Sequence, residues 1–84
     1  MINKKQVNEL SQEIRGLINN GFKESAEQKI KSANLTTEEM NFLHKCLQAD
    51  GYDPNTDMFI LYESDNSAFL DLVKQVMDNV KKNK

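Results

Sequence analysis

Three oxygen-bearing side chains occupy alternate positions in Asp53-x-Asn55-x-Asp57. This spacing matches the first ligands of a calcium-binding loop. The sixth position of such a loop requires glycine for its sharp turn, but here it is Met58. The twelfth position requires a bidentate glutamate, but here it is Ser64. We therefore interpret the segment as a polar loop and predict no bound metal.

His44 and Cys46 also have side chains suited to metal binding or nucleophilic attack. They are two positions apart in a predicted helix, so they point in different directions and cannot act as a pair. The chain has no further histidine or cysteine that could complete a zinc site. We expect Cys46 to pack in the core and His44 to lie at its margin. Carboxylates are numerous, but nothing predicts an apolar cleft that would tune them for acid–base catalysis, so we expect neither an enzyme nor a cofactor.

Charge is segregated along the chain. Residues 34–73 contain eight acidic side chains and one lysine, whereas both flanking segments are weakly basic and the total charge is −2. An anionic region of this kind repels nucleic acid and favours a cationic partner. The charge pattern therefore indicates a class of partner without indicating an activity.

The length of 84 residues, with three glycines and one proline, predicts one all-α domain covering 1–84. Apolar residues recur at three- and four-residue steps, which is typical of amphipathic helices. The pattern predicts a small bundle with helices over about 3–20, 23–33, 37–50 and 67–81, and allows a fifth over 54–63.

The helix over 37–50 has the clearest predicted boundaries. Thr36 and Glu39 have the spacing of a capping box, in which each side chain bonds to the other residue's amide. Gly51 suits the left-handed position after the helix, and Tyr52 could then pack on Leu47 as in a Schellman motif.

Residues 54–63 allow two interpretations. Asp53-Pro54 can open a short helix, because aspartate caps the end and proline suits the first turn. The apolar run over 58–62 is equally compatible with a buried strand. A lone strand leaves its backbone groups unpaired, so the helix is our leading interpretation. A strand at 58–62 would require pairing with another chain, for example in a homodimer.

Phe59 and Tyr62 lie in this apolar run, with Asp53, Asp57 and Glu63 around them. One interpretation is that the bundle buries the run on most sides. The other is that the two rings are anchors within an acidic rim, which is typical of a protein-binding hot spot. On the second interpretation we expect a protein-binding module that acts as an inhibitor, adaptor or immunity-type factor on a partner with a basic surface.

The spacing of apolar residues over 28–47 also vaguely matches a helix-turn-helix, so the alternative is a nucleic-acid-binding regulator. Glu38 and Glu39 on its second helix oppose that function, because they would approach phosphates. The single cysteine and the absence of an apolar leader or membrane span predict a cytoplasmic protein. Ten lysines against one arginine indicate a bacterial or phage origin.

Overall fold

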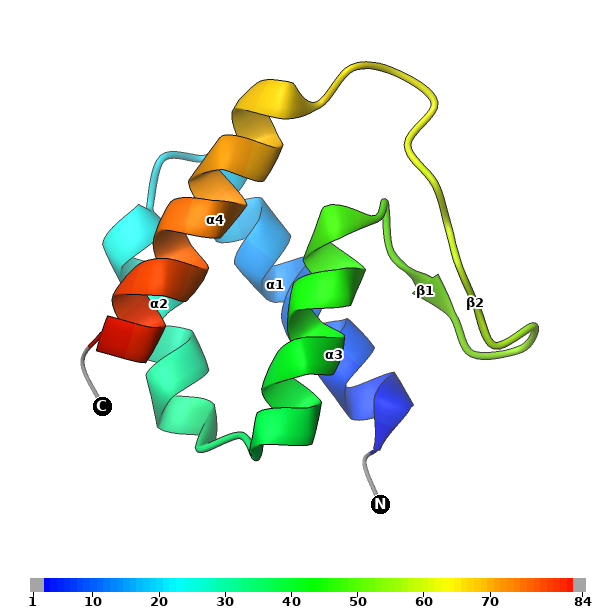
Figure 1. The fold of residues 1–84 in the computed structure, drawn as a ribbon, viewed down its shortest axis with the longest axis horizontal. Helices are drawn as coiled ribbons and strands as arrows, with labels where there is room; N and C mark the ends of the chain where they lie inside the picture. The colour runs from blue at the N-terminus through cyan, green and yellow to red at the C-terminus, as the bar shows by residue number, and fades with distance from the viewer. Residues whose placement is uncertain (1–2, 83–84) are drawn as a thin grey trace.

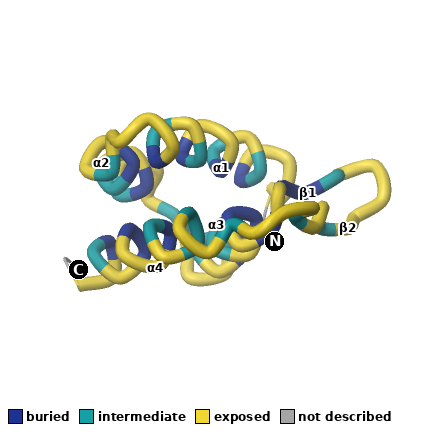
Figure 2. The backbone as a smooth tube through the Cα atoms, turned by 90° about the horizontal axis from the view of Figure 1, so that it is seen from above, coloured by how far each residue is buried: buried dark blue, intermediate teal, exposed yellow. Residues whose placement is uncertain are grey.

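The computed structural model describes residues 3–82, and within this range four helices enclose one apolar core. The elements in chain order are α1 (Lys4–Asn19), α2 (Lys23–Ala33), α3 (Thr37–Gln48), β1 (Tyr52–Asp53), β2 (Met58–Phe59) and α4 (Ser67–Lys82). One layer contains α1 and α2, and the other contains α3 and α4 (Figures 1 and 2). The all-α bundle is confirmed, and the ends of the helices predicted over 3–20, 23–33, 37–50 and 67–81 lie within two residues of the observed ones.

The core forms where the apolar stripes of the four helices meet. The helices pack in a closed ring in the order α1, α2, α4, α3 and back to α1, and α1 also contacts α4 across the ring. The largest fully buried apolar side chains come from all four helices; they are Ile14, Ile30, Leu43, Leu47, Val73, Val76 and Met77. Burying a side chain of this size contributes about 1.5–3 kcal/mol, so this interior is the main stabilising element of the fold.

Side-chain hydrogen bonds from nearby residues cap the N-termini of α1 and α3. The Asn3 side chain accepts a hydrogen bond from the Gln6 amide and caps α1. At α3, the Glu39 amide donates to the Thr36 hydroxyl over 3.2 Å, and the Thr36 amide donates to the Glu39 carboxylate over 3.1 Å. The predicted capping box is therefore confirmed.

The Schellman motif predicted at the end of α3 does not form. The helix stops at Gln48, and Ala49 is already extended, so Gly51 is not the left-handed residue that follows the helix. The φ of Gly51 is +134°, which serves the entry into the hairpin. A Schellman motif is unnecessary because side chains from elsewhere in the chain satisfy the last carbonyls. Arg15 donates to the Cys46 carbonyl over 3.0 Å, and the Tyr62 hydroxyl donates to the Leu47 carbonyl over 3.2 Å.

The helix expected over 54–63 is also wrong, because residues 52–59 form an antiparallel hairpin and residues 60–63 are not helical. Tyr52 pairs with Phe59 and Asp53 with Met58. The alternative strand over 58–62 is partly present, as β2, but its partner is β1 of the same chain rather than another chain. The Asp50 amide donates to the Ile60 carbonyl over 2.6 Å, and the Ile60 amide donates to the Gly51 carbonyl over 2.9 Å. Two residues thus oppose Ile60, as in a β-bulge.

A shared local bond explains why the sequence also suggested a helix. The Asp53 carboxylate accepts from the Asn55 amide over 2.9 Å. Aspartate makes the same bond at a helix N-terminus and in an Asx turn, so the dipeptide Asp53-Pro54 fits both structures. The backbone here forms the turn, since Asp57 has a left-handed φ of +55°, outside the range of a right-handed helix. The turn also allows the Phe59 ring to pack on the rings of Phe42 and Tyr52.

Candidate functional site

Residues 49–66, which we call the acidic connection, join α3 to α4. Connections longer than about 12–15 residues are uncommon in compact domains and are often functional. Apart from its two short strands, this one has no regular structure. It leaves α3, forms the hairpin and arcs back to the start of α4 (Figure 1). It contains no lysine or arginine and five carboxylates, on Asp50, Asp53, Asp57, Glu63 and Asp65.

Phe59, one of the two predicted anchors, faces the bundle. Its ring centroid lies 5.6 Å from that of Phe42 on α3 and 5.5 Å from that of Tyr52 on β1. Phe42 and Tyr52 are themselves in edge-to-face contact at 5.0 Å. The half-buried Phe59 ring therefore completes a cluster that holds the hairpin against α3.

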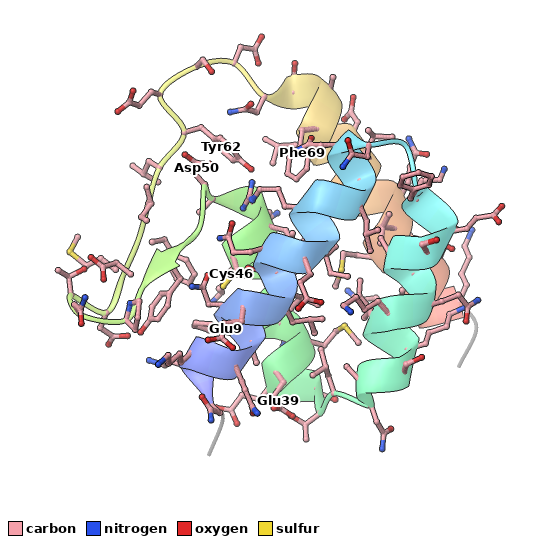
Figure 3. The ribbon with its side chains drawn as sticks, turned by 180° about the vertical axis from the view of Figure 1, so that it is seen from behind. Glu9, Glu39, Cys46, Asp50, Tyr62 and Phe69 are labelled. Carbon is pink, nitrogen blue, oxygen red and sulfur yellow. The ribbon has the colours of Figure 1, made fainter. Side chains whose placement is uncertain are left out.

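Tyr62, the other predicted anchor, also faces inward. Its hydroxyl accepts a hydrogen bond from Arg15 and donates to the Leu47 carbonyl. Its ring lies 6.3 Å from the ring of Phe69 on α4, and Figure 3 shows the two side chains on the same side of the bundle. Tyr62 thus ties the acidic connection to α1, α3 and α4.

The exposed apolar groups of the acidic connection are the neighbours of the predicted anchors. Met58, Ile60 and Leu61 are 65%, 48% and 78% exposed. Successive side chains of a strand point to opposite faces, so the inward direction of Phe59 turns Met58 and Ile60 outward. The sequence identified the run but not which of its members face solvent, because that depends on the register of the hairpin.

Asp57 forms the most specific polar contact in the hairpin. Its carboxylate accepts a hydrogen bond from the Tyr52 hydroxyl and lies 3.1 Å from Nζ of Lys4 on α1. The bond from Tyr52, and then the bond and charge of Lys4, lower the pKa of Asp57. The bond to Asp57, together with burial, raises the pKa of Tyr52 to about 12. This contact therefore joins β1, the hairpin turn and α1.

The other carboxylates of the acidic connection differ in their surroundings. Asp53 is half-buried and holds the hairpin turn, whereas Glu63 is exposed. Asp65 accepts from the Ser67 amide over 3.0 Å, at the start of α4. Asp50 lies 4.0 Å from the Arg15 guanidinium. Asp50 and Asp57 thus face cations of α1, and most of the unbalanced negative charge lies on Asp53, Glu63 and Asp65.

Arg15 is the structural residue that the sequence analysis did not identify. Its Nη2 donates to the Cys46 carbonyl and, over 2.8 Å, to the Ala49 carbonyl. Its guanidinium carbon lies 5.5 Å from the centroid of the Tyr62 ring and 5.2 Å from that of Phe69. The chain has one arginine and ten lysines. The planar guanidinium, with several donors in fixed directions, can reach these separate acceptors, which a single ammonium group suits less well. That difference in composition was the only available signal.

Cys46 and His44 lie where we expected them. Cys46 is fully buried, and His44 is half-buried at the edge of the core. Burial raises the pKa of the Cys46 thiol to about 11, so it remains protonated and weakly nucleophilic at neutral pH. Burial, and then the nearby charge of Lys81, lower the pKa of His44. Neither side chain is poised for chemistry.

The described range, 3–82, contains no group of three or more histidine, cysteine or acidic residues arranged to hold a metal ion. In the motif resembling a calcium loop, the Asp53 carboxylate bonds to the Asn55 amide. The Asp57 carboxylate bonds to Tyr52 and Lys4. These oxygens thus stabilise the hairpin.

The helices considered for a helix-turn-helix, α2 and α3, occupy opposite corners of the bundle. Each packs on α1 and α4. Glu38 and Asn41 are exposed on α3, and Lys45 is its basic residue near them. A recognition helix with this surface would bring a carboxylate towards phosphates.

Comparison with known proteins reveals no matching family model, no matching curated protein and no matching solved structure. Within residues 3–82, no helix has the length and apolar composition required to cross a membrane. The site is therefore interpreted from its own geometry.

Proposed function

We propose that this chain is a protein-binding module, acting as an inhibitor, adaptor or immunity-type factor, and that its acidic connection docks on a basic protein surface. The observation that carries the proposal is the exposure of Met58, Ile60 and Leu61 within a segment that has five carboxylates and no basic residue. Apolar anchors surrounded by charge of one sign are typical of a docking surface for a partner of the opposite charge.

The exposed side chains and the inward rings have different roles in this proposal. Met58 and Leu61 are the main anchors, because covering an exposed side chain of this size contributes about 1.5–3 kcal/mol. Phe59 and Tyr62 support them from behind by holding the backbone in place. Asp53 and Glu63, with Asp57, attract the partner and set the salt dependence of association.

A selection with a displayed library of random twelve-residue peptides tests the proposal. The immobilised protein should enrich peptides with apolar residues flanked by lysine or arginine. Raising the salt concentration from about 50 mM to about 500 mM should weaken their binding, because screening reduces the attraction of exposed charges. Enrichment of acidic peptides, or of none, would contradict the proposal.

Paired variants separate this surface from general stickiness. The double substitution Met58→Ser and Leu61→Ser should weaken the enriched peptides at least tenfold. Phe22→Ser is the matched control, because Phe22 is a similarly exposed apolar residue, 57% exposed, in the turn between α1 and α2. Equal losses in the two proteins would show that the acidic connection is not the docking surface.

We further propose that the protein works in the cytoplasm, because a buried, protonated Cys46 suits a reducing compartment. Fractionation of host cells, followed by detection with an antibody against the chain, tests this. Recovery from a membrane or an extracellular fraction would contradict it.

A further inference from the structure

The two edges of the hairpin are not equivalent. The outer edge of β1 faces α1, where the Asn8 side chain donates to the Tyr52 carbonyl over 3.0 Å. Directly after β2, the amide and carbonyl of Ile60 point towards the other side of the hairpin, because they bond to Gly51 and Asp50. Backbone groups alternate in direction along a strand, so those of Phe59 and Leu61 point outward. No hydrogen bond within residues 3–82 engages the amides of Phe59 and Leu61.

Apolar side chains accompany this free edge. Met58 and Ile60 are exposed on the outer face of β2, and Leu61 follows directly. A depression of about 390 Å³ adjoins Phe59 and is lined by Lys4, Glu38, Asn41, Phe42, Lys45 and Phe59. In Figure 2, β2 lies nearer the layer of α3 and α4, whereas β1 lies nearer α1. An added strand could place one apolar side chain in this depression, against Phe42 and Phe59.

This edge could pair with a second copy of the chain or with a segment of another protein, and the charges beside it distinguish these two occupants. If two copies paired antiparallel about Ile60, Asp57 of one copy would lie opposite Glu63 of the other. Shifting the register by two residues places Asp57 opposite Asp65. Like charges directly opposite each other destabilise a strand pair. Lys4 offsets the charge of Asp57 alone, and the acidic connection has no basic residue of its own, so a basic segment fits the edge better than a second copy.

We propose that the outer edge of β2 receives an extended segment of another protein as a third strand. This segment has alternating apolar residues in its centre and lysine or arginine at both ends. Its backbone bonds to the Phe59 and Leu61 groups, and its basic ends lie near Asp53, Asp57 and Glu63. Main-chain bonds of this kind provide affinity, and side-chain pockets provide specificity. The inference rests on the proposed function and specifies how the partner binds.

Alternate N-methylation of a peptide tests this binding mode. The probe is a nine-residue peptide with three valines separated by two threonines and a lysine pair at each end. One version carries N-methyl groups on the valines and another on the threonines. In an added strand only one of these sets faces β2, so one version should bind about tenfold more weakly than the other. On the protein, the Phe59 and Leu61 amides should gain protection from hydrogen exchange.

A substitution in the protein provides the second measurement. Leu61→Pro and Leu61→Ala both remove the leucine side chain, but only proline also removes the backbone N–H donor. Leu61→Pro should therefore weaken the unmethylated peptide about tenfold more than Leu61→Ala does. Circular dichroism checks that both variants keep the bundle, and the methylated peptides test the mode without any change to the protein.

The outcomes separate the two proposals. If the peptide binds in a manner sensitive to Met58→Ser and Leu61→Ser, but the two methylated versions bind equally, strand addition is wrong and protein binding stands. If neither this peptide nor any library peptide binds, both proposals fail. If light scattering detects a dimer at micromolar concentration that Leu61→Pro abolishes and Leu61→Ala retains, the edge belongs to a second copy and the basic segment is wrong.

Discussion

The helical core and the acidic connection are stabilised by different interactions. In the core, apolar side chains from all four helices pack against one another and are fully buried. The acidic connection is tied to α1 through three polar side chains, those of Lys4, Asn8 and Arg15. Its rings add contacts to α3 and α4, but its most exposed apolar side chains face solvent. The large apolar side chains are thus divided between the buried core of the bundle and the exposed surface of the acidic connection.

This difference indicates how the two regions respond to change. Apolar packing is not directional and depends little on pH or salt. Hydrogen bonds are directional, and those made by titratable side chains depend, like ion pairs, on a particular protonation state. The acidic connection should therefore loosen while the bundle remains folded, as expected of segments with few buried contacts.

Leu47→Ala should destabilise the whole molecule by about 2–5 kcal/mol, because Leu47 is fully buried and its loss leaves a cavity. Urea unfolding followed by circular dichroism measures the change. The matched control is Leu61→Ala, at a largely exposed position, which should change the free energy of unfolding by no more than about 0.5 kcal/mol. Similar losses in both variants would mean that the core and the acidic connection do not differ.

Arg15→Ala should cost about 1–3 kcal/mol, because the Cys46 and Ala49 carbonyls and the Tyr62 hydroxyl each lose a donor. Hydrogen exchange should show faster opening of the acidic connection than of the helices. Lys29→Ala is the control, since Lys29 forms an exposed ion pair with Glu13 at 2.6 Å, which is worth at most about 1 kcal/mol. Uniformly faster exchange over all helices would show that Arg15 stabilises the core instead.

The contact between Tyr52 and Asp57 should stabilise the hairpin only within a window of pH. The raised pKa of Tyr52 means that its contribution is complete below about pH 10, its ordinary value, and is lost as the pH rises through about 12. The lowered pKa of Asp57 means that its contribution is complete above about pH 4 and is lost as the pH falls through the folded-state value.

Absorbance titration of the Tyr62→Phe variant measures this contact, because Tyr52 is then the only tyrosine. The midpoint should lie near 12 and return towards 10 when Asp57→Asn is added. An unchanged midpoint in the second variant would show that burial alone causes the shift.

The double substitution Met58→Ser and Leu61→Ser should have the smallest effect on stability, within about 0.5 kcal/mol for each residue, because both side chains are exposed. Thermal unfolding measures it, with Phe22→Ser as the control. The same double variant should lose the peptide binding described above. A large loss of stability would show that these side chains support the fold, and the distinction between interior and docking surface would fail.

The boundaries of the helices could be predicted because their causes are local. The capping box of Thr36 and Glu39 spans four consecutive residues, and the predicted range of α2 matches the observed helix. These features depend on neighbours within about one helical turn, so periodicity and capping rules were sufficient to find them.

The site could be predicted only in outline. The sequence identified an acidic segment with an apolar run, but selected Phe59 and Tyr62 where the exposed residues are Met58, Ile60 and Leu61. Which residues of the run face the core depends on the strand register, here Tyr52 opposite Phe59. A shift of the register by one residue would turn each side chain to the opposite face.

The sequence alone determined the helices, the segregation of charge and the acidic segment with its apolar run, because these depend on residue types and their short-range spacing. Tertiary structure alone decided that residues 52–59 form a hairpin and that Arg15 caps α3 and holds Tyr62. The contacts of Arg15 join residues 31–47 positions apart. No local pattern specifies such contacts, because they form only once the packed helices bring α1 beside the end of α3.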